Sequence, residues 1–252
     1  MRRNAVRAAW SEGRPATNLW IDIAAPVTVE GLAKLPYDSF TVDMQHCLID
    51  RGILPMLLQA ISLGSGAPMV RVSQNDPAEI GHALDAGAYG VVCPTVETAE
   101  EAKRFVDACD YPPRGNRSWG PVRGLLYGGA DYFDNYAGEI LRIALIETKK
   151  GLENIEAIAA TPGLDMVYLG PNDMGVSYGS KPSYTPNNPH VEHAVEVLAA
   201  TARKHGLAAG MHTASAEVAK SAMKQGYTFL SLGYASKIMV AAAGKVLNDI
   251  KP

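Results

Sequence analysis

The sequence predicts a single (β/α)8 TIM barrel, a fold of the α/β class. Eight short apolar segments, many of them rich in β-branched residues, alternate with segments of helical spacing, and no linker of biased composition interrupts them. The chain has 252 residues, and one barrel of this kind takes about 250. Hydrophobic residues make up 47% of the chain and charged residues 19%, which is typical of a globular domain. We therefore expect one domain over residues 1–252.

The first half of the chain supplies four strands after a short helix over residues 1–12, which ends at Gly13 and Pro15. Strands are expected at 18–23, 39–43, 68–72 and 89–94, and helices at 28–35, 48–63, 76–86 and 98–109. The third of these helices has a clear start. Asp76 can cap it, Pro77 suits its first position, and Glu79 stands where a capping box needs a glutamate.

The second half supplies the other four strands. Strands are expected at 141–146, 165–169, 208–211 and 228–231, and helices at 152–160, 191–205, 216–225 and 234–250. The segment 111–136, rich in glycine, proline, arginine and aromatic residues, is longer than an ordinary connection, so we expect it to be functional or interfacial. Residues 175–188 are predicted to be a loop. The last helix has an unusually apolar middle, residues 238–243.

The charge and the cysteines exclude several classes of protein. The net charge is −3 without a basic run, which indicates neither a nucleic-acid nor a membrane-surface partner. The three cysteines lack CxxC spacing, which fits a reducing compartment and argues against a disulfide framework or a structural zinc site. No signal peptide and no apolar run near 18 residues is found, so the expected location is the cytoplasm.

Several chemically active side chains stand at the carboxyl ends of the expected strands, where the active sites of barrels lie. They are Trp20, Asp22, Asp43 with the nearby His46, Arg71, Cys93, Glu147 and Asp173. Glu147 and Asp173 are hard carboxylates without a cysteine or histidine cluster nearby, which suits an oxygen-preferring ion such as Mg²⁺ or Mn²⁺. The alternative is a first-turn glutamate before two lysines and a helix-capping aspartate.

Asp43 and His46 are three residues apart, so the carboxylate could hold the imidazole in one tautomer as a base and its orienter. A loop aspartate and a packed histidine are the alternative. Arg71 lies inside an apolar strand, where it either aims at a carboxylate or developing enolate or forms an internal salt bridge. His212 follows the seventh strand and could line the mouth of the barrel. The remaining histidines are expected on outer helices or loops: His82, His190, His193 and His205.

Three arginines, Arg114, Arg117 and Arg123, alternate with glycines in the long segment. They could bind an anionic substrate, or they could belong to a surface loop packed on a neighbouring subunit. No P-loop and no GxGxxG after a strand is present, so a nucleotide site is not expected. Cys47 and Cys93 stand near the predicted site but are expected to be small core residues.

Together, several stretches resemble the HpcH/HpaI aldolase family, the metal-dependent class II pyruvate aldolases of the phosphoenolpyruvate/pyruvate barrel superfamily. The matching stretches are Val42-Asp43-Met44-Gln45-His46, Val70-Arg71-Val72, Leu84-Asp85-Ala86-Gly87-Ala88, Tyr111 to Arg117, Ile146-Glu147-Thr148 and Gly170-Pro171-Asn172-Asp173-Met174. They run in family order between about residues 12 and 235. Each stretch alone is weak, but jointly they are highly specific.

The resemblance implies a role for each residue. Glu147 and Asp173 match the ligands of a divalent metal (Mg²⁺, Mn²⁺ or Co²⁺), and Arg71 matches the arginine on the pyruvate keto oxygen. Asp43 and His46 match the acid/base dyad. The backbone from Gly170 through Asn172 to Asp173 matches the stretch that receives the pyruvate carboxylate, and Trp20 matches an aromatic near the site. The family also implies a homo-hexamer, a dimer of trimers, with C-terminal helices exchanged between subunits.

Two positions depart from the family's pattern. Gln45 stands where many members have glutamate, and Leu145 stands where some have glutamine. A subgroup that resembles hydroxypyruvate- or sugar-acid-type aldolases carries the same Gln-His pair, so Gln45 is expected to tune the choice of substrate.

The resulting hypothesis is a metal-dependent, reversible aldol reaction. It cleaves a 4-hydroxy-2-oxo acid, of sugar-acid or aromatic-catabolite type, to pyruvate or hydroxypyruvate and an aldehyde. No lysine stands at an expected strand end, which argues against a Schiff-base aldolase. The alternatives are a CoA-thioester lyase of the citryl/malyl type and a non-catalytic barrel that binds a small acid. Decarboxylation of oxaloacetate is possible as a side activity.

Overall fold

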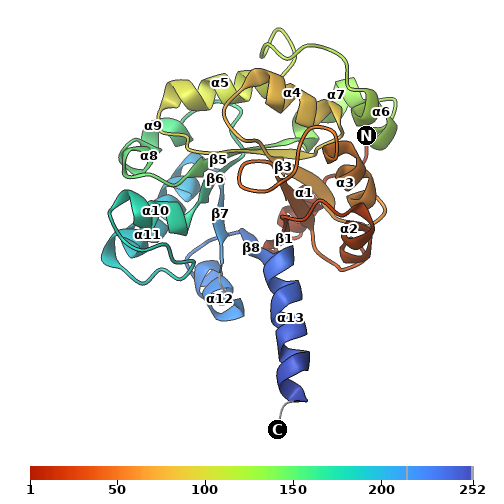
Figure 1. Cartoon of the computed structure of the whole chain (residues 1–252). Coiled ribbons are helices and arrows are strands. Elements are labelled where there is room, and N and C mark those ends of the chain that lie inside the picture. Colours follow the sequence, from red (N-terminus) through yellow and green to blue (C-terminus); the bar gives the residue numbers. More distant parts are fainter. Residues whose placement is uncertain (214, 251–252) are drawn as a thin grey trace.

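The computed structural model of the chain describes residues 1–213 and 215–250, and it contains the predicted closed barrel. Eight parallel strands follow one another around the barrel in chain order, and the last pairs with the first. They are β1 (Ala16–Ile21), β2 (Ser39–Asp43), β3 (Ala67–Arg71), β4 (Gly90–Cys93), β5 (Leu141–Ile146), β6 (Met166–Leu169), β7 (Ala208–His212) and β8 (Phe229–Tyr234). Figure 1 shows the strands at the centre with the helices around them.

Helices precede the first strand, form parts of the connections between strands and follow the last strand. They are α1 (Ala5–Ser11), α2 (Pro26–Leu32), α3 (Leu54–Ile61), α4 (Pro77–Asp85), α5 (Ala99–Cys109), α6 (Val122–Gly128), α7 (Tyr132–Glu139), α8 (Lys149–Glu153), α9 (Ile155–Ala159), α10 (Pro171–Ser177), α11 (Pro189–His205), α12 (Ala216–Lys224) and α13 (Ala235–Asp249). No helix in this described part of the chain is long and apolar enough to cross a membrane.

Two predicted strands, 39–43 and 141–146, have the predicted bounds, and the largest difference at any strand end is the three further residues of β8. β8 extends to Tyr234 because this residue pairs with Trp20 of β1. The predicted helix at 48–63 begins only at Leu54. Its first turns are replaced by a local turn in which the Asp50 carboxylate accepts the N–H groups of Gly52 and Ile53.

Local side-chain contacts set other boundaries. The predicted helix at 152–160 is broken at Asn154, which separates α8 from α9. Asp76 caps α4, because its carboxylate accepts the N–H groups of Ala78 and Glu79. The capping box expected at Glu79 is not formed, since its carboxylate binds the backbone N–H and hydroxyl of Ser73 instead.

The strands divide their side chains between two cores. Along β1, Leu19 and Ile21 pack outward against the helices, whereas Trp20 points into the barrel. The same alternation sends Met69 of β3 inward and Val70 outward. The inner core therefore consists of every second residue of the strands. The residue that continues this inward-facing series at the carboxyl end of a strand faces the mouth of the barrel.

Helix α1 closes the opposite, N-terminal end of the barrel. Val6 and Ala9 are fully buried and pack with the inner core. Asn4 caps the helix through the N–H of Val6, and its amide group donates to the carbonyls of Tyr89 and Glu139. The helix predicted at the start of the chain is thus a plug, not a surface appendage.

The long segment 111–136 contains α6 and most of α7. Its arginines bind protein groups. Arg117 is buried and pairs with Asp85 at 2.7 Å, and Arg114 donates to the Tyr136 hydroxyl at 3.0 Å. Arg123 donates to Ser62 at 2.7 Å and to two backbone carbonyls. These contacts give the arginines a structural role within the subunit.

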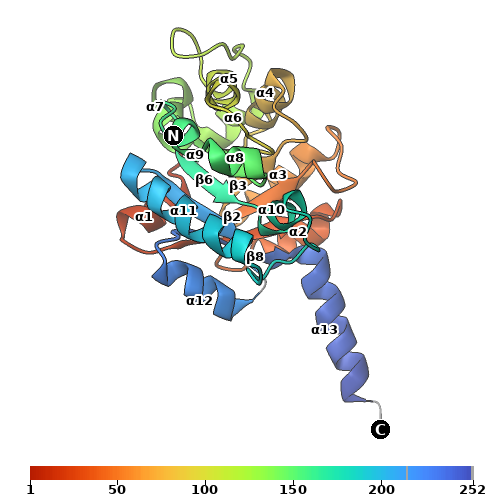
Figure 2. The same ribbon diagram turned by 90° about the vertical axis from the view of Figure 1, so that its left-hand side faces the viewer.

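Helix α13 projects away from the barrel (Figures 1 and 2). Of its described residues only Ala235 is buried, while six large apolar side chains are exposed: Ile238, Met239, Val240, Val246, Leu247 and, just beyond the helix, Ile250. Its first turn is held by Asp22, which accepts the backbone N–H and the hydroxyl of Ser236. Exchange of this helix between subunits stays a prediction.

Candidate functional site

A cavity of about 340 Å³ opens at the carboxyl ends of the strands. It is lined by Trp20, His46, Arg71, Leu145, Glu147, Tyr168, Gly170, Pro171, Asn172, Asp173, Val176, Pro182, Tyr184, His212 and Tyr234. The alternation of the strands explains this gathering. Arg71 continues the inward series of Met69, Glu147 that of Leu145, and Gly170 that of Tyr168. Most of the predicted site residues are therefore brought together.

Arg71 is held beside the cavity by a two-point contact with Asp43. Its Nε lies 2.9 Å from Asp43 Oδ1, and its Nη2 lies 2.5 Å from Oδ2. Burial alone would lower the pKa of Arg71 and raise that of Asp43. The paired hydrogen bonds and charges outweigh burial, so the pKa of Arg71 is raised and the pKa of Asp43 is lowered. The guanidinium also lies 4.6 Å from the centre of the Trp20 ring.

His46 lines the cavity, but its ring is not oriented by Asp43 as predicted. The Asp43 carboxylate accepts the backbone N–H groups of Gln45 at 3.0 Å and of His46 at 3.3 Å. It also accepts the Cys47 thiol at 3.3 Å. No hydrogen bond joins it to the His46 imidazole among the described residues. The carboxylate is fully buried and occupied by Arg71, so it positions the loop backbone and not the ring.

Glu147 is buried at the end of β5 and faces Asp173 across the cavity lining. Burial raises the pKa of Glu147 to about 7, and the nearby negative charge of Asp173 adds to this rise. The carboxylate accepts the backbone N–H of Thr95 at 2.9 Å and the Thr95 hydroxyl at 3.0 Å. Thr95 has a φ of 52°, and in the described chain it is the one residue other than glycine with a positive φ. This strained backbone aims both donors at Glu147.

Gly170 leaves the space that Glu147 needs. A Cβ atom at Gly170 would lie 2.9 Å from both Cβ and Oε2 of Glu147, which is too close for any side chain. Asn172 follows in the lining, and its buried Oδ1 has no hydrogen-bond partner among the described residues. Gln45 is half-buried and does not line the cavity, but its Oε1 also lacks a partner within the described chain.

The opposite wall of the cavity is aromatic. The centre of the His212 ring lies 4.7 Å from the centre of the Tyr184 ring and 4.7 Å from that of the Tyr234 ring. Trp20 completes the wall, with its ring centre 5.9 Å from that of His212. Burial lowers the pKa of His212 to about 3, and the positive charges of Arg71 and Lys237 add to the effect. His212 is therefore neutral at physiological pH.

Sequence reasoning missed Thr95, Tyr168, Tyr184 and Tyr234. Tyr234 ends β8, so the rule of strand ends would have found it if the strand had been predicted to its true end. Tyr168 precedes Gly170 by two residues and shares its inward face, which alternation could have indicated. Tyr184 comes from the loop at 175–188, where no pattern in the sequence distinguishes it.

Several predicted positions lie outside the cavity lining. Asp22 anchors α13, and Cys93 is a fully buried core residue as predicted. Cys47 is half-buried beside Asp43. Burial, followed by the charge of Asp43, raises the pKa of the Cys47 thiol to about 12, so it remains a neutral hydrogen-bond donor.

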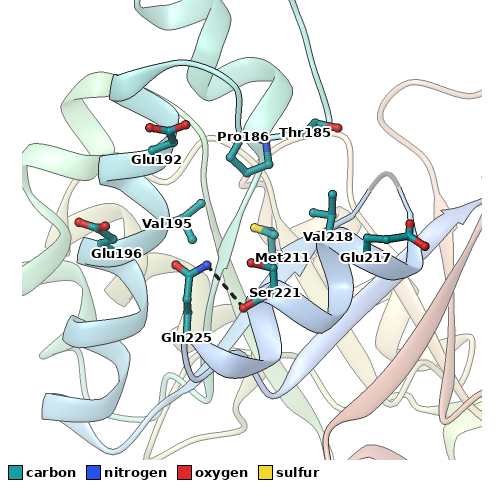
Figure 3. Close-up of a pocket in the computed structure, with 11 residues that line it drawn as sticks. Thr185, Pro186, Glu192, Val195, Glu196, Met211, Glu217, Val218, Ser221 and Gln225 are labelled. Atoms are coloured by element: carbon teal, nitrogen blue, oxygen red, sulfur yellow. Dashed lines mark hydrogen bonds between the residues drawn. The ribbon is translucent and has the colours of Figure 1, made fainter.

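A larger cavity of about 450 Å³ lies between α11 and α12, outside the barrel (Figure 3). Glu192 and Glu196 of α11 and Glu217 of α12 border it, and Val195 and Met211 form part of its apolar lining. None of the predicted site residues lines it. We therefore assign the chemistry to the smaller cavity at the strand ends.

The donor set of the smaller cavity suits a hard cation that shares its ligands with substrate and water. Within the described residues, no group of three or more His, Cys, Asp or Glu side chains forms a complete protein cage for a metal. Glu147 and Asp173 supply two carboxylates, and the charge of Asp173 adds to the effect of burial in raising the pKa of Glu147. A divalent cation between them would relieve the repulsion between their charges, and carboxylate oxygens are the ligands that Mg²⁺ and Mn²⁺ prefer.

The sequence of this chain is similar to those of known proteins of one family. The sequence profile of the family described as HpcH/HpaI aldolase/citrate lyase matches residues 16–242. A hydroxypyruvate/pyruvate aldolase of Rhizorhabdus wittichii is 36% identical over 98% of this chain and 99% of its own length. A 5-keto-4-deoxy-D-glucarate aldolase of Klebsiella pneumoniae is 32% identical over 98% and 97%. A 2-dehydro-3,6-dideoxy-6-sulfogluconate aldolase of Pseudomonas putida is 33% identical over 92% and 91%.

A solved structure is also similar over the whole chain. The HpcH/HpaI aldolase/citrate lyase family protein from Burkholderia cenocepacia superposes with a TM-score of 0.92 at 27% identity. The match covers 99% of this chain and 100% of that one. The barrel, its plug and its terminal helix therefore belong to an architecture that has been observed by crystallography.

Proposed function

Because this chain belongs to the HpcH/HpaI aldolase/citrate lyase family and is a carbon–carbon lyase, we propose that it is a metal-dependent aldolase. The reaction cleaves a 4-hydroxy-2-oxo acid reversibly to pyruvate or hydroxypyruvate and an aldehyde. The observation that carries the proposal is the convergence of Arg71, Glu147 and Asp173 on one cavity. The names of three relatives, which include sugar-acid aldolases, support a substrate of the sugar-acid type.

Glu147 and Asp173 would hold the divalent cation, which is Mg²⁺, Mn²⁺ or Co²⁺. Bound there, the ion would supply Lewis-acid polarisation of the substrate keto group. Thr95 fixes one oxygen of Glu147 with two hydrogen bonds, so the carboxylate is preorganised. Gly170 supports the same geometry, because any larger residue would displace Glu147.

Arg71 stabilises the negative charge that develops on the enolate oxygen when the carbon–carbon bond breaks. Its contact with Asp43 holds the planar guanidinium rigidly, and its burial strengthens its electrostatic effect. The backbone from Gly170 to Asp173 receives the substrate carboxylate. Within this stretch the N–H groups of Asn172 and Asp173 belong to the first turn of α10 and have no intrahelical acceptors, whereas the Gly170 N–H donates to the Ile146 carbonyl.

His46 accepts the proton of the C4 hydroxyl of the substrate. As that proton leaves, the C3–C4 bond breaks, the C4 hydroxyl becomes the aldehyde, and the bonding electrons move to the enolate of the 2-oxo acid. Protonated His46 then returns the proton to C3 of the enolate, which gives pyruvate or hydroxypyruvate and restores the neutral imidazole. Asp43 contributes by fixing the backbone of His46 and the side chain of Arg71.

The aldehyde portion lies against the wall of Trp20, His212, Tyr184 and Tyr234. The cavity volume is at the lower end of the range of about 300–1,000 Å³ found for small-molecule sites. It favours a small acid and aldehyde over a ligand as large as a CoA thioester. Gln45 precedes the cavity-lining His46 in the chain and is proposed to tune substrate choice through its amide oxygen, which has no partner among the described residues.

Metal removal tests the proposal. We expect chelator-treated protein to lose pyruvate-forming cleavage of 4-hydroxy-2-oxo acids and to regain it with Mg²⁺, Mn²⁺ or Co²⁺. Glu147→Gln should lower kcat/KM by more than about a hundredfold because it removes a ligand charge. Glu153→Gln, an exposed change on α8, is the matched control and should leave the rate unchanged. Full cleavage activity in metal-free protein would overturn the scheme.

A further inference from the structure

An exposed lysine, Lys237, lies in the first turn of α13 beside the aromatic wall of the cavity. Its Nζ is 4.6 Å from the centre of the Tyr184 ring and 5.1 Å from the centre of the Tyr234 ring. It also donates a hydrogen bond to the Tyr184 hydroxyl at 3.5 Å. Both tyrosines line the cavity, so the ammonium group lies where this wall meets solvent.

The charge of Lys237 is not neutralised by a carboxylate in the described part of the chain. Lys245, two turns further along the same helix, pairs with Asp249 at 3.0 Å, whereas Lys237 contacts only the two aromatic rings and a hydroxyl. Arg71, the other cation at the cavity, is already paired with Asp43. Lys237 is thus the cation at this rim that remains available to a ligand.

The two ends of the cavity differ in charge. The end with Glu147 and Asp173 is acidic, whereas the aromatic wall carries a neutral His212 and the positive Lys237. A substrate whose 2-oxo acid end binds at the carboxylates would extend its other end along the wall. Lys237, which lies against the rings of Tyr184 and Tyr234, is the cation beside that wall.

We propose that Lys237 determines specificity by binding an anionic group, a carboxylate or a sulfonate, on the aldehyde portion of the substrate. This inference rests on the proposed aldolase function, and it narrows the aldehyde to one that carries an acid. Contact with two rings already restricts the lysine side chain, so little conformational entropy is lost when an anion binds. The partial exposure of the rim makes the effect dependent on salt.

The test compares matched aldehydes with pyruvate in the aldol direction, on the full-length, metal-loaded protein. Succinic semialdehyde and glyoxylate carry a carboxylate, and butanal and glycolaldehyde are their neutral counterparts. We expect the wild type to prefer the anionic member of each pair. Lys237→Met should reduce that preference about tenfold, as expected for the loss of one charge-assisted contact, and should leave the neutral aldehydes within about twofold. Lys237→Arg should retain most of the preference.

Lys245→Met is the matched control, because it removes the same charge from the same helix outside the cavity. The preference of the wild type should also shrink as NaCl is raised, while that of Lys237→Met should not. An unchanged preference in Lys237→Met, with altered thermal unfolding only, would show that Lys237 merely attaches α13 and would overturn the inference. Turnover of neutral aldehydes without anionic preference in the wild type would do the same while sparing the aldolase function. A wild type that turns over no aldehyde would overturn both the role of Lys237 and the proposed aldolase function.

Discussion

Arg71 contacts the buried carboxylate of Asp43 on one side and faces the cavity on the other. The sequence left an internal salt bridge and a functional guanidinium as alternatives, and the structure combines them. The pair fixes the arginine, while its position at the end of β3 presents it to a ligand. A buried ion pair is weak evidence for stability, so its position at the cavity is the better reason to regard it as functional.

Thr95 illustrates what a sequence pattern does not reveal at this scale. Its left-handed backbone follows from its place between β4 and the capped start of α5, and that conformation turns its N–H toward Glu147. Nothing in the residues Pro94-Thr95-Val96 by themselves predicts a positive φ, because threonine rarely adopts one.

Because His212 is neutral in the folded protein, the stability of the protein should depend on pH in a predictable way. The pKa of His212 is about 3 in the folded protein, mainly through burial and then through Arg71 and Lys237, against 6.5 when exposed. Below pH 6.5 the unfolded chain takes up a proton at this histidine that the folded protein does not. The contribution of the neutral His212 to the free energy of unfolding is therefore complete above pH 6.5 and is lost as the pH falls toward 3. When the pH is lowered from 7 to 5, we expect the free energy of unfolding of His212→Phe to fall by roughly 2 kcal/mol less than that of the wild type.

Urea unfolding at several pH values measures this difference. His193→Gln replaces an exposed histidine of α11 and serves as the control for the removal of a histidine outside the cavity. Parallel pH profiles for the wild type and His212→Phe would show that His212 is protonated equally in the folded and unfolded states.

At the scale of elements, α1 decides how the barrel is closed at its N-terminal end. The sequence predicted the helix and its end, but a seven-residue helix has little stability alone and forms here because Val6 and Ala9 complete the inner core. The plug is attached through Asn4, which satisfies one helix N–H and two barrel-end carbonyls.

Asn4→Ala should therefore destabilise the protein by roughly 2–4 kcal/mol, because it removes a cap and leaves two buried or part-buried carbonyls without a donor. Thermal or chemical unfolding followed by circular dichroism measures the loss. Asn135→Ala on α7 is the matched control, since the exposed Asn135 makes only local contacts with Asp131, and we expect a change below about 0.5 kcal/mol. Equal effects of the two substitutions would contradict the role given to Asn4.

At the scale of the whole molecule, α13 has an apolar surface that its own barrel does not cover. Val240 and Ile250 are 72% and 76% exposed, and four further large apolar side chains surround them. Exposed apolar surface of this kind is typical of an interface between proteins. The sequence had already indicated it, through the apolar middle of the helix and the resemblance to a family with exchanged C-terminal helices.

We therefore predict that the protein is an oligomer held partly by α13. Light scattering coupled to size-exclusion chromatography should show a hexamer for the wild type and smaller species for a Val240→Glu/Leu247→Glu variant, because two buried charges oppose association. Lys245→Glu changes the charge of the same helix without touching its apolar residues and should leave the mass unchanged. A monomeric wild type at micromolar concentration would refute this prediction.

The sequence by itself determined the barrel, the eight segments that form its strands and most of the residues at the strand ends. It could do so because strand alternation, helix spacing and the carboxyl-end rule all depend on neighbouring residues. Arg71 and Glu147 were found in this way, since Arg71 ends β3 and Glu147 directly follows β5, and Asp173 was found in the first turn after β6.

Only the tertiary structure decided which side chains that are distant in the sequence contact one another. Asp43 was predicted to orient His46, three residues away, but it binds Arg71, which is 28 residues away in the sequence and directly opposite it in the β2–β3 register. Lys237 and Tyr184 meet for a comparable reason, because the start of α13 and the loop at 175–188 converge only when the barrel closes. Such contacts depend on strand register and loop path, and local sequence patterns contain no record of either.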